Sequence, residues 1–316
     1  MHDVNVKGKI RELLRFVPIS IRSVLNQALC GHEEDLQEVV LRSGRPVCVY
    51  IKSKQMYLTQ NGCLTCSVDS QPLVVASQKD ITDCFNISCG YSVYSHLNEI
   101  RSGFLTLSGG HRIGISGTAV VSNGSIVNIR DISTISMRFA REVVGCGESI
   151  AALIFKSRDG LLLCGSPCSG KTTVLRDVAR LMSEQFRSRV AVVDTRGEIG
   201  GTVDGIQQMN IGMCDVLNGY PRAEGIEQAV RVLSPQYVVC DELGSDEDIK
   251  AIISGVNSGV KFISTIHAAS KEELLSRKNA VALLNTKAFE NVVFLKGRES
   301  PGEISCSYEI GEIIDV

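Results

Sequence analysis

The chain has 316 residues, a formal net charge of −2, 44% hydrophobic residues and 22% charged residues. Its length suffices for about two domains, and its composition is typical of a soluble globular protein. It lacks the basic excess of a protein that clamps a nucleic-acid backbone, and no window approaches the roughly 18 consecutive apolar residues of a membrane span. Charged residues also interrupt the apolar ones near the N-terminus, so we expect no secretory signal and a cytoplasmic protein.

Residues 9–30 carry apolar side chains at roughly helical spacing, which predicts a helical segment. Pro18 lies in the middle of it. Because proline lacks an N–H and disfavours helix in the residue before it, we predict two short helices with a break just before Pro18. We assign this segment a packing role only.

A β-type alternation begins at residues 38–58, around a turn at residues 43–46. Residues 104–121 and 126–139 continue in the same style. We expect glycines to break the first of these two segments at four positions: Gly109, Gly110, Gly114 and Gly117. Residues 1–145 are therefore predicted to form an α+β domain with a mostly antiparallel sheet.

We interpret the Gly-Cys-Gly of residues 145–147 as a hinge, because the pattern changes after it. Five short apolar runs follow, separated mostly by helical patterns, at residues 161–164, 190–193, 237–240, 262–265 and 292–295. Continuous apolar strands that alternate with helices are typical of a parallel sheet buried on both faces. We predict that residues 146–316 form an α/β domain with a RecA-like P-loop core, with its ligand at the carboxyl edge of the sheet.

The first of these strands leads into a loop with the spacing of a phosphate-binding loop. Gly165 and Gly170 let successive backbone N–H groups point into one concavity, and the following helix adds the positive end of its dipole. Lys171 can reach the β and γ oxygens of ATP, and the Thr172 hydroxyl can ligate the Mg²⁺ that bridges them. The predicted nucleotide-binding residues are Gly165, Ser166, Pro167, Cys168, Ser169, Gly170, Lys171, Thr172 and Thr173.

Charged and titratable side chains also follow the other predicted strands: Asp194, Arg196 and Glu198 after the second, Asp241 and Glu242 after the third, and His267 after the fourth. An apolar strand followed by Asp-Glu fits a Walker B element, in which Asp241 holds magnesium and Glu242 orients the attacking water. The same pair could instead cap the next helix. Glu198 is a second candidate for the catalytic carboxylate, and His267 fits either a γ-phosphate sensor or a structural histidine.

These elements resemble the Walker A loop, acidic box, Walker B glutamate and histidine box of the secretion ATPases that drive type II and type IV secretion and pilus assembly. Within that family the chain is more similar still to a sporulation branch, through residues 38–46, 109–117 and 234–236. The resemblance covers nearly the whole chain. Cys168 departs from the glycine that is common at its position, and residues 265–268 are a variant of the histidine box.

The resemblance implies a magnesium-dependent, ATP-hydrolysing motor that works as a ring, as a hexamer in this family. It further implies membrane-embedded sporulation channel proteins as partners, and a cytoplasmic position peripheral to the membrane, on the mother-cell side of the channel to the forespore. Two other functions stay open: a RecA-like, nucleic-acid-dependent ATPase and a nucleotide-binding assembly scaffold with little turnover. The near-neutral charge and the lack of an aromatic and basic strip argue against a nucleic-acid partner.

Phosphoryl transfer gains from an arginine near the γ-phosphate. Arg176 lies more than one turn into the helix after the phosphate loop, which is a poor position for reaching the nucleotide of its own subunit. We expect instead that an arginine of the N-terminal domain serves the neighbouring subunit in a closed ring. The candidates are Arg112, Arg130 and Arg138.

Twelve cysteines are present, most of them scattered singly. Cys164 and Cys168 lie beside or inside the phosphate loop, where a disulfide would distort it, so we interpret the cysteines as reduced thiols. Four others could hold zinc through thiolates: Cys63, Cys66, Cys84 and Cys89. The other interpretation of these four is that they are small buried side chains.

Overall fold

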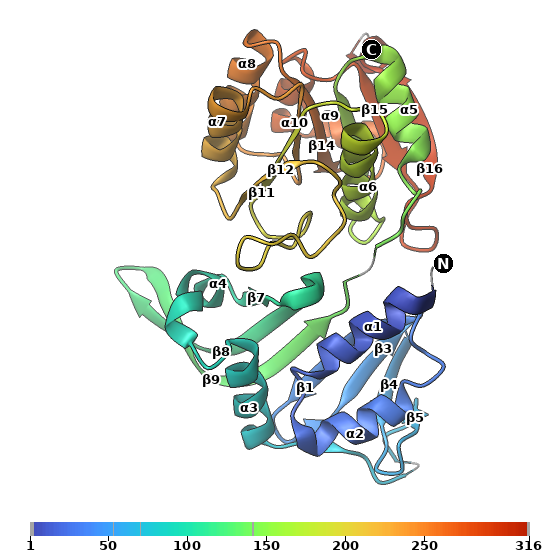
Figure 1. Ribbon diagram of the computed structural model, residues 1–316, viewed down its shortest axis with the longest axis vertical. Coiled ribbons are helices and arrows are strands. Elements are labelled where there is room, and N and C mark those ends of the chain that lie inside the picture. Colours follow the sequence, from blue (N-terminus) through green and yellow to red (C-terminus); the bar gives the residue numbers. More distant parts are fainter. Residues whose placement is uncertain (1–2, 53, 70, 141, 315–316) are drawn as a thin grey trace. The chain divides into compact units, whose positions relative to one another are not determined.

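The computed structural model describes residues 3–52, 54–69, 71–140 and 142–314 (Figure 1). The chain divides between residues 141 and 142 into two compact units, each with its own cluster of buried apolar side chains. In the described part of the chain, no helix is long and apolar enough to cross a membrane.

Seven described strands form one antiparallel sheet in the first unit, in the order β5, β4, β3, β1, β9, β8, β7. Their bounds are β1 Leu36–Arg42, β3 Cys48–Ile51, β4 Lys54–Leu58, β5 Leu64–Thr65, β7 Phe104–Thr106, β8 Arg112–Ser122 and β9 Ser125–Arg138. A separate two-stranded ribbon pairs β2 (Arg45–Pro46) with β6 (Val75–Ala76). The helical elements are α1 Asp3–Leu14, α2 Ile19–Ala28, α3 Gln78–Ser88, η1 Val93–His96, α4 Leu97–Arg101 and η2 Ser108–Gly110. The predicted α+β character and antiparallel sheet are confirmed.

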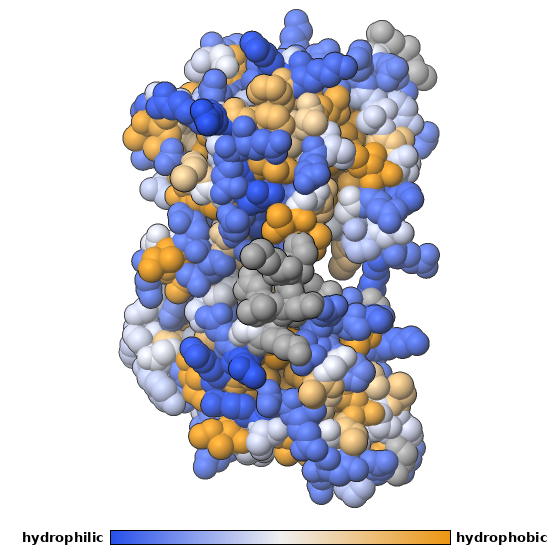
Figure 2. Space-filling view, turned by 45° about the vertical axis from the view of Figure 1, so that its right-hand side comes forward, coloured by the Kyte–Doolittle hydropathy of each residue, from blue (hydrophilic) through white to orange (hydrophobic). Residues whose placement is uncertain are grey.

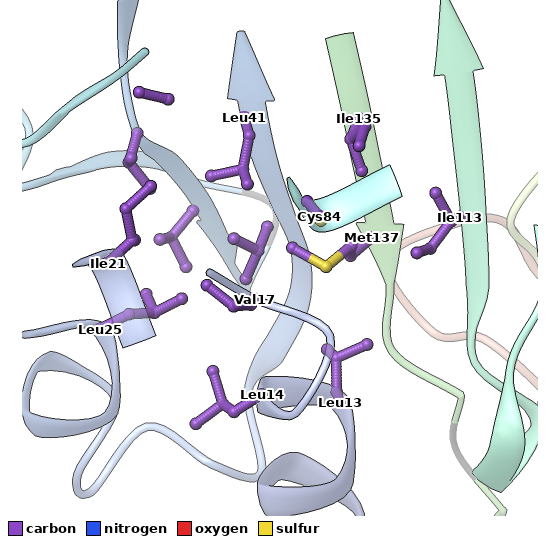
Figure 3. Packing of buried hydrophobic residues seen from close by; sticks show 14 of the residues in the cluster. Leu13, Leu14, Val17, Ile21, Leu25, Leu41, Cys84, Ile113, Ile135 and Met137 are labelled. Carbon is purple, nitrogen blue, oxygen red and sulfur yellow. The ribbon is translucent and has the colours of Figure 1, made fainter. Parts of the chain in front are cut away.

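The first two helices confirm the predicted break at Pro18. Helix α1 ends at Leu14, and Pro18 is the N-cap of α2, where its fixed φ of −55° costs nothing and its missing N–H is not needed. Figure 3 shows the core between these helices and the sheet, which brings together Leu13, Leu14, Val17, Ile21, Leu25, Leu41, Cys84, Ile113, Ile135 and Met137. Each fully buried aliphatic side chain here contributes about 1.5–3 kcal/mol to stability.

Strand β8 corrects part of the glycine prediction. The break at Gly109 and Gly110 is confirmed, because both adopt positive φ angles (76° and 75°) in the turn η2 between β7 and β8. The breaks predicted at Gly114 and Gly117 are wrong, since β8 runs through both. A Cβ atom at Gly117 would lie 2.6 Å from the carbonyl oxygen of Arg130, so this glycine serves a close approach of two strands at a bulge.

The second unit is a seven-stranded sheet in the order β12, β11, β13, β14, β10, β15, β16, parallel except for β16. Its strands are β10 Leu161–Gly165, β11 Val190–Asp194, β12 Asp215–Asn218, β13 Tyr237–Cys240, β14 Lys261–His267, β15 Asn291–Leu295 and β16 Ile304–Glu309. Its helices are α5 Glu148–Ser157, α6 Lys171–Glu184, α7 Arg222–Leu233, α8 Asp246–Asn257, α9 Lys271–Ser276, α10 Lys278–Leu284 and α11 Ile310–Ile314. The five predicted strands and the RecA-like parallel core are confirmed, whereas β12 and β16 were not predicted.

The parallel arrangement brings the polar strand ends to one edge of this sheet. Strand β10 lies between β14 and β15, and Gly165 at its end is in register with His267 at the end of β14. Likewise Val193 of β11 pairs with Cys240 of β13, so the residues that follow them, Asp194 and Asp241, are neighbours. Every residue of β10 and β11 is buried, which anchors these ends firmly.

The segment before α5, interpreted above as a hinge, is bound to α6. The N–H of Gly147 donates to Oδ2 of Asp177 at 2.8 Å, and the Sγ of Cys146 lies 3.8 Å from the carbonyl oxygen of Thr173. A Cβ atom at Gly147 would lie 2.8 Å from the backbone nitrogen of Val178. The chain therefore passes so close to α6 that a larger residue than glycine would collide with it.

Hydrophilic side chains predominate on the face shown in Figure 2, with apolar residues interspersed in small groups. The most exposed large apolar side chains come from separate segments, such as Tyr94 in η1 (88% exposed) and Met213 before β12 (82% exposed). Exposed apolar residues that stand apart in this way are normal in folded proteins.

Candidate nucleotide site

The loop between β10 and α6 curls around the N-terminus of α6. Gly170 is the N-cap residue with φ of +89°, and Cys168 has φ of +64°. Both angles lie in the left-handed region, which explains why glycine is common at the position of Cys168 in such loops. A Cβ atom at Gly165 would lie 2.4 Å from Oγ of Ser169, so the first glycine of the motif is also required by packing.

The connection between β15 and β16 supports this loop from one side. The N–H of Gly302 donates to the carbonyl oxygen of Ser169 at 2.8 Å, and a Cβ atom at Gly170 would lie 2.8 Å from the nitrogen of Gly302. This contact was not predicted. Its only signal was the Pro301-Gly302 turn after the last apolar strand, which predicts a turn but not what the turn contacts.

Lys171 is nearly buried, with 6% of its surface exposed. Its Nζ donates to the carbonyl oxygens of Gly165 and Ser166, both at 2.9 Å, and lies 3.1 Å from Nδ1 of His267. Burial lowers the pKa of the Lys171 ammonium, while the nearby carboxylates, Asp241 first among them, act in the opposite direction. The lysine is thus held inside the loop at the position from which it can reach a bound polyphosphate.

Thr172 and Asp241, the two predicted magnesium ligands, lie together. The Oγ1 of Thr172 donates to Oδ2 of Asp241 at 2.6 Å. The other carboxylate oxygen of Asp241 accepts a hydrogen bond from Thr265, whose Oγ1 in turn accepts the N–H of Glu242 at 2.8 Å. A hydroxyl and a carboxylate facing each other are the oxygen donors that Mg²⁺ prefers, so this pair fits the ion. The sequence placed Thr265 in the variant histidine box but gave no signal for these two hydrogen bonds.

Both carboxylate oxygens of Glu242 are engaged. Oε1 lies 2.9 Å from Nε2 of His267, and Oε2 accepts from Nη1 of Arg196 at 2.7 Å. Because the Lys171 ammonium donates to Nδ1 of His267, the histidine proton belongs on Nε2, and Nε2 donates to Glu242. Burial by itself would raise the pKa of Glu242, but the hydrogen bond from His267 and the charge of Arg196 together lower it.

Asp194 and Glu198 have different positions in the acidic loop after β11. Asp194 is 2% exposed, and its carboxylate accepts three backbone N–H groups, from Glu198 at 2.9 Å, Ile199 at 3.1 Å and Gly200 at 2.8 Å. Burial raises the pKa of Asp194, while these hydrogen bonds act against that rise. Asp194 and Glu198 both line an open recess with Asp241 and Glu242. The three accepted N–H groups commit the carboxylate of Asp194 to the shape of the loop.

The four arginines considered for the γ-phosphate differ in their contacts and exposure. Arg176 is 7% exposed and donates to backbone carbonyl oxygens of Glu198 and Ile199, at the back of the acidic loop. In the first unit, the guanidinium of Arg112 lies 4.0 Å from the ring centroid of Phe104. The side chains of the other two candidates from that unit are largely exposed, at 67% for Arg130 and 69% for Arg138. That one of these three serves a neighbouring subunit stays a prediction.

The four cysteines weighed as a zinc site fall into two classes. Cys63 and Cys66 are exposed, whereas Cys84 and Cys89, in α3 and at its C-cap, are buried. Burial raises the pKa of the Cys84 thiol to about 12 and that of Cys89 to about 11. In the residues that the structure describes, no group of three or more His, Cys, Asp or Glu side chains is arranged to hold a metal ion.

The central parallel strand, its phosphate loop and the Asp-Glu pair beside it define a P-loop protein with the fold of the secretion ATPases. The X-ray structure of the Legionella pneumophila ATPase DotB is 17% identical with a TM-score of 0.53, over 89% of this chain and 76% of DotB. The structure of the pilus retraction motor PilT with bound ADP is 12% identical with a TM-score of 0.54, over 84% of this chain and 76% of PilT. These similarities confirm the predicted fold.

The sequence comparisons give the family. A family model described as sporulation stage III, protein AA, matches residues 7–314. Stage III sporulation protein AA of Bacillus subtilis (strain 168) is 30% identical over 306 residues, which is 95% of each chain. The chain belongs to the sporulation stage III protein AA family, so the predicted resemblance to a sporulation branch of the secretion ATPases is confirmed.

Proposed function

We propose that this protein is a magnesium-dependent ATPase that acts as a motor in endospore formation, powering the assembly of, or transport through, the channel between mother cell and forespore. One observation carries the proposal: Lys171, His267 and Glu242 form a continuous chain of contacts beside the bonded pair of Thr172 and Asp241. The names of the two structural neighbours, an ATPase and a pilus retraction motor, agree with it.

The residues suggest how hydrolysis proceeds. The Nζ of Lys171 exchanges its two loop carbonyls for β and γ oxygens of ATP. Thr172 and Asp241 would hold a magnesium ion, which would supply charge stabilisation to the bound phosphates. Glu242 orients a water molecule and takes its proton as the bond from the water oxygen to the γ phosphorus forms and the bond to ADP breaks. His267 is hydrogen-bonded to both Lys171 and Glu242, so it links the lysine that contacts the phosphates to this carboxylate.

Glu242 is the better candidate for the catalytic carboxylate because its side chain is connected to the phosphate loop through His267. Its backbone also has a φ of +54°, a left-handed conformation that costs a non-glycine residue about 1–2 kcal/mol. Strained residues of this kind cluster at functional sites. Glu198 lines the same recess, so it remains the alternative base that the experiment on these two residues must test.

We further propose that the protein forms a ring, a hexamer, and works in the cytoplasm on the mother-cell side, peripheral to the membrane and against membrane-embedded channel proteins. The family and the motor named among its structural neighbours support this. Closed cyclic symmetry would give every protomer of such a ring the same contacts with its neighbours.

The experiment that tests the proposed function measures ATP turnover with Mg²⁺, with and without single-stranded DNA, together with the mass in solution. Turnover that is independent of DNA, from an assembly larger than a monomer, is the expected result. Strong stimulation by DNA would favour the nucleic-acid-dependent ATPase. Nucleotide binding without measurable turnover would favour the assembly scaffold.

A further inference from the structure

Arg196, in the loop after β11, places its guanidinium directly against Glu242. Nη1 donates to Oε2 of Glu242 at 2.7 Å, and the arginine side chain is 52% exposed. Across the described ranges of the chain this guanidinium has no other partner. A guanidinium carries five N–H donors in a rigid fork, so most of them remain for an incoming anion while the bond to Glu242 persists.

The contacts of Glu242 lead from Arg196 to the position of the γ-phosphate. The opposite oxygen of that carboxylate binds Nε2 of His267, and the other ring nitrogen lies 3.1 Å from Nζ of Lys171. One carboxylate and one imidazole thus connect Arg196 to the ammonium of Lys171, and the lysine of a phosphate loop contacts the β and γ oxygens. Arg196 also lines the recess that extends to Asp241.

The other arginine of this recess is held by a structural contact. Nη1 of Arg222 donates to Oδ2 of Asp248 at 2.9 Å, and the Asp248 side chain is only 3% exposed. The same carboxylate oxygen accepts the N–H groups of Gly244 and Ser245. Removing Arg222 would leave a buried carboxylate without its cation, so this arginine stabilises the turn after Glu242. Arg196, in contrast, is not the partner of a buried carboxylate of this kind.

We propose that Arg196 supplies, in its own protomer, the arginine that stabilises the charge on the γ-phosphoryl group during ATP hydrolysis. The inference rests on the proposed ATPase function and goes beyond it, because the expectation was an arginine from a neighbouring subunit. One N–H of the guanidinium keeps Glu242 in place, and the others bind γ oxygens. The water proton passes to Glu242, the bond from the γ phosphorus to ADP breaks, and Arg196 remains protonated throughout.

Three variants of the full-length protein test this role: Arg196→Ala, Arg196→Lys and, as a matched control, Arg231→Ala at the exposed end of α7. We expect Arg196→Ala to lower kcat by about 10³-fold or more, as removal of an arginine finger does. KM and the binding of a fluorescent ATP analogue should change little. Arg196→Lys should recover part of kcat, because lysine keeps the charge but not the fork. Arg231→Ala should match the unsubstituted protein.

A mixing experiment separates action within one protomer from action across two. Arg196→Ala and Lys171→Ala remove two parts of the same site, so their mixture should hydrolyse no more ATP than the two proteins measured apart. Regained activity in the mixture would show that Arg196 acts on a neighbouring protomer. Turnover of Arg196→Ala at or above the parental rate would show that Arg196 only holds Glu242 and does not assist hydrolysis. Either result overturns the inference and leaves the ATPase function standing. Absence of turnover in the unsubstituted protein would overturn that function instead.

Discussion

Thr265 offers the sharpest test of how the site is held together, because it is fully buried and its hydroxyl joins two functional residues. Its Oγ1 donates to Asp241 and accepts the N–H of Glu242. Thr265→Val replaces the hydroxyl with a methyl group of similar size and so removes both bonds. The bond to the carboxylate contributes about 1.5–3 kcal/mol and the bond from the backbone about 0.5–1.5 kcal/mol. We expect the second unit to lose about 2–4 kcal/mol of unfolding free energy.

The loss can be measured by urea denaturation and by thermal melting. For a unit of this size, each kcal/mol corresponds to about 2–4 °C in Tm, so a decrease of roughly 5–15 °C is expected. Hydrolysis should fall as well, because the carboxylate of Asp241 and the backbone of Glu242 lose the hydroxyl that holds them in place. Thr265→Ser keeps the hydroxyl and should retain most of the stability. A valine variant as stable and as active as the parent would refute the reasoning.

Further substitutions address Lys171, Glu242 and Asp194, with Lys250→Ala and Glu198→Gln for comparison. Lys171→Ala should abolish nucleotide binding, measured by calorimetry, while the fold survives, whereas the exposed Lys250→Ala on α8 should bind normally. Glu242→Gln should keep Mg-ATP bound but slow turnover by about 10²–10⁴-fold, and unchanged turnover there with a loss in Glu198→Gln would assign the base to Glu198. Asp194→Asn should cost about 1–3 kcal/mol for each backbone N–H left without an acceptor, and equal stability in denaturation would contradict its role in shaping the loop.

The buried strands and the phosphate loop could be predicted because their signals are local. A run such as residues 161–164 has only apolar side chains, and Gly165, Gly170 and Lys171 follow it at fixed spacing. The edge strands β12 and β16 were missed because edge positions are exposed and need no apolar run. Glycine within β8 misled the prediction, because a glycine that breaks a strand and one that admits a close neighbour look the same in sequence.

The partners of the site residues could not be predicted, since they depend on which strands become neighbours. That β13 lies between β11 and β14 decides that Glu242 meets both Arg196 and His267. The sequence placed these three residues after separate strands but carried no signal for the order of the strands. The same holds for Thr265, whose bonds to the Asp-Glu pair follow from the pairing of β13 with β14.

Two neighbouring aspartates at the carboxyl edge of the second sheet have different hydrogen-bond partners. Asp194 ends β11 and Asp241 follows β13, its neighbour in the sheet, yet the first accepts three backbone N–H groups and the second accepts the hydroxyl of Thr172. A carboxylate that already accepts three N–H groups is committed to the shape of its loop. That shape carries Arg196, two residues further on, to within hydrogen-bonding distance of Glu242. On the proposed function, the acidic box would act through the arginine it positions, and Asp241 would be the carboxylate left for the metal.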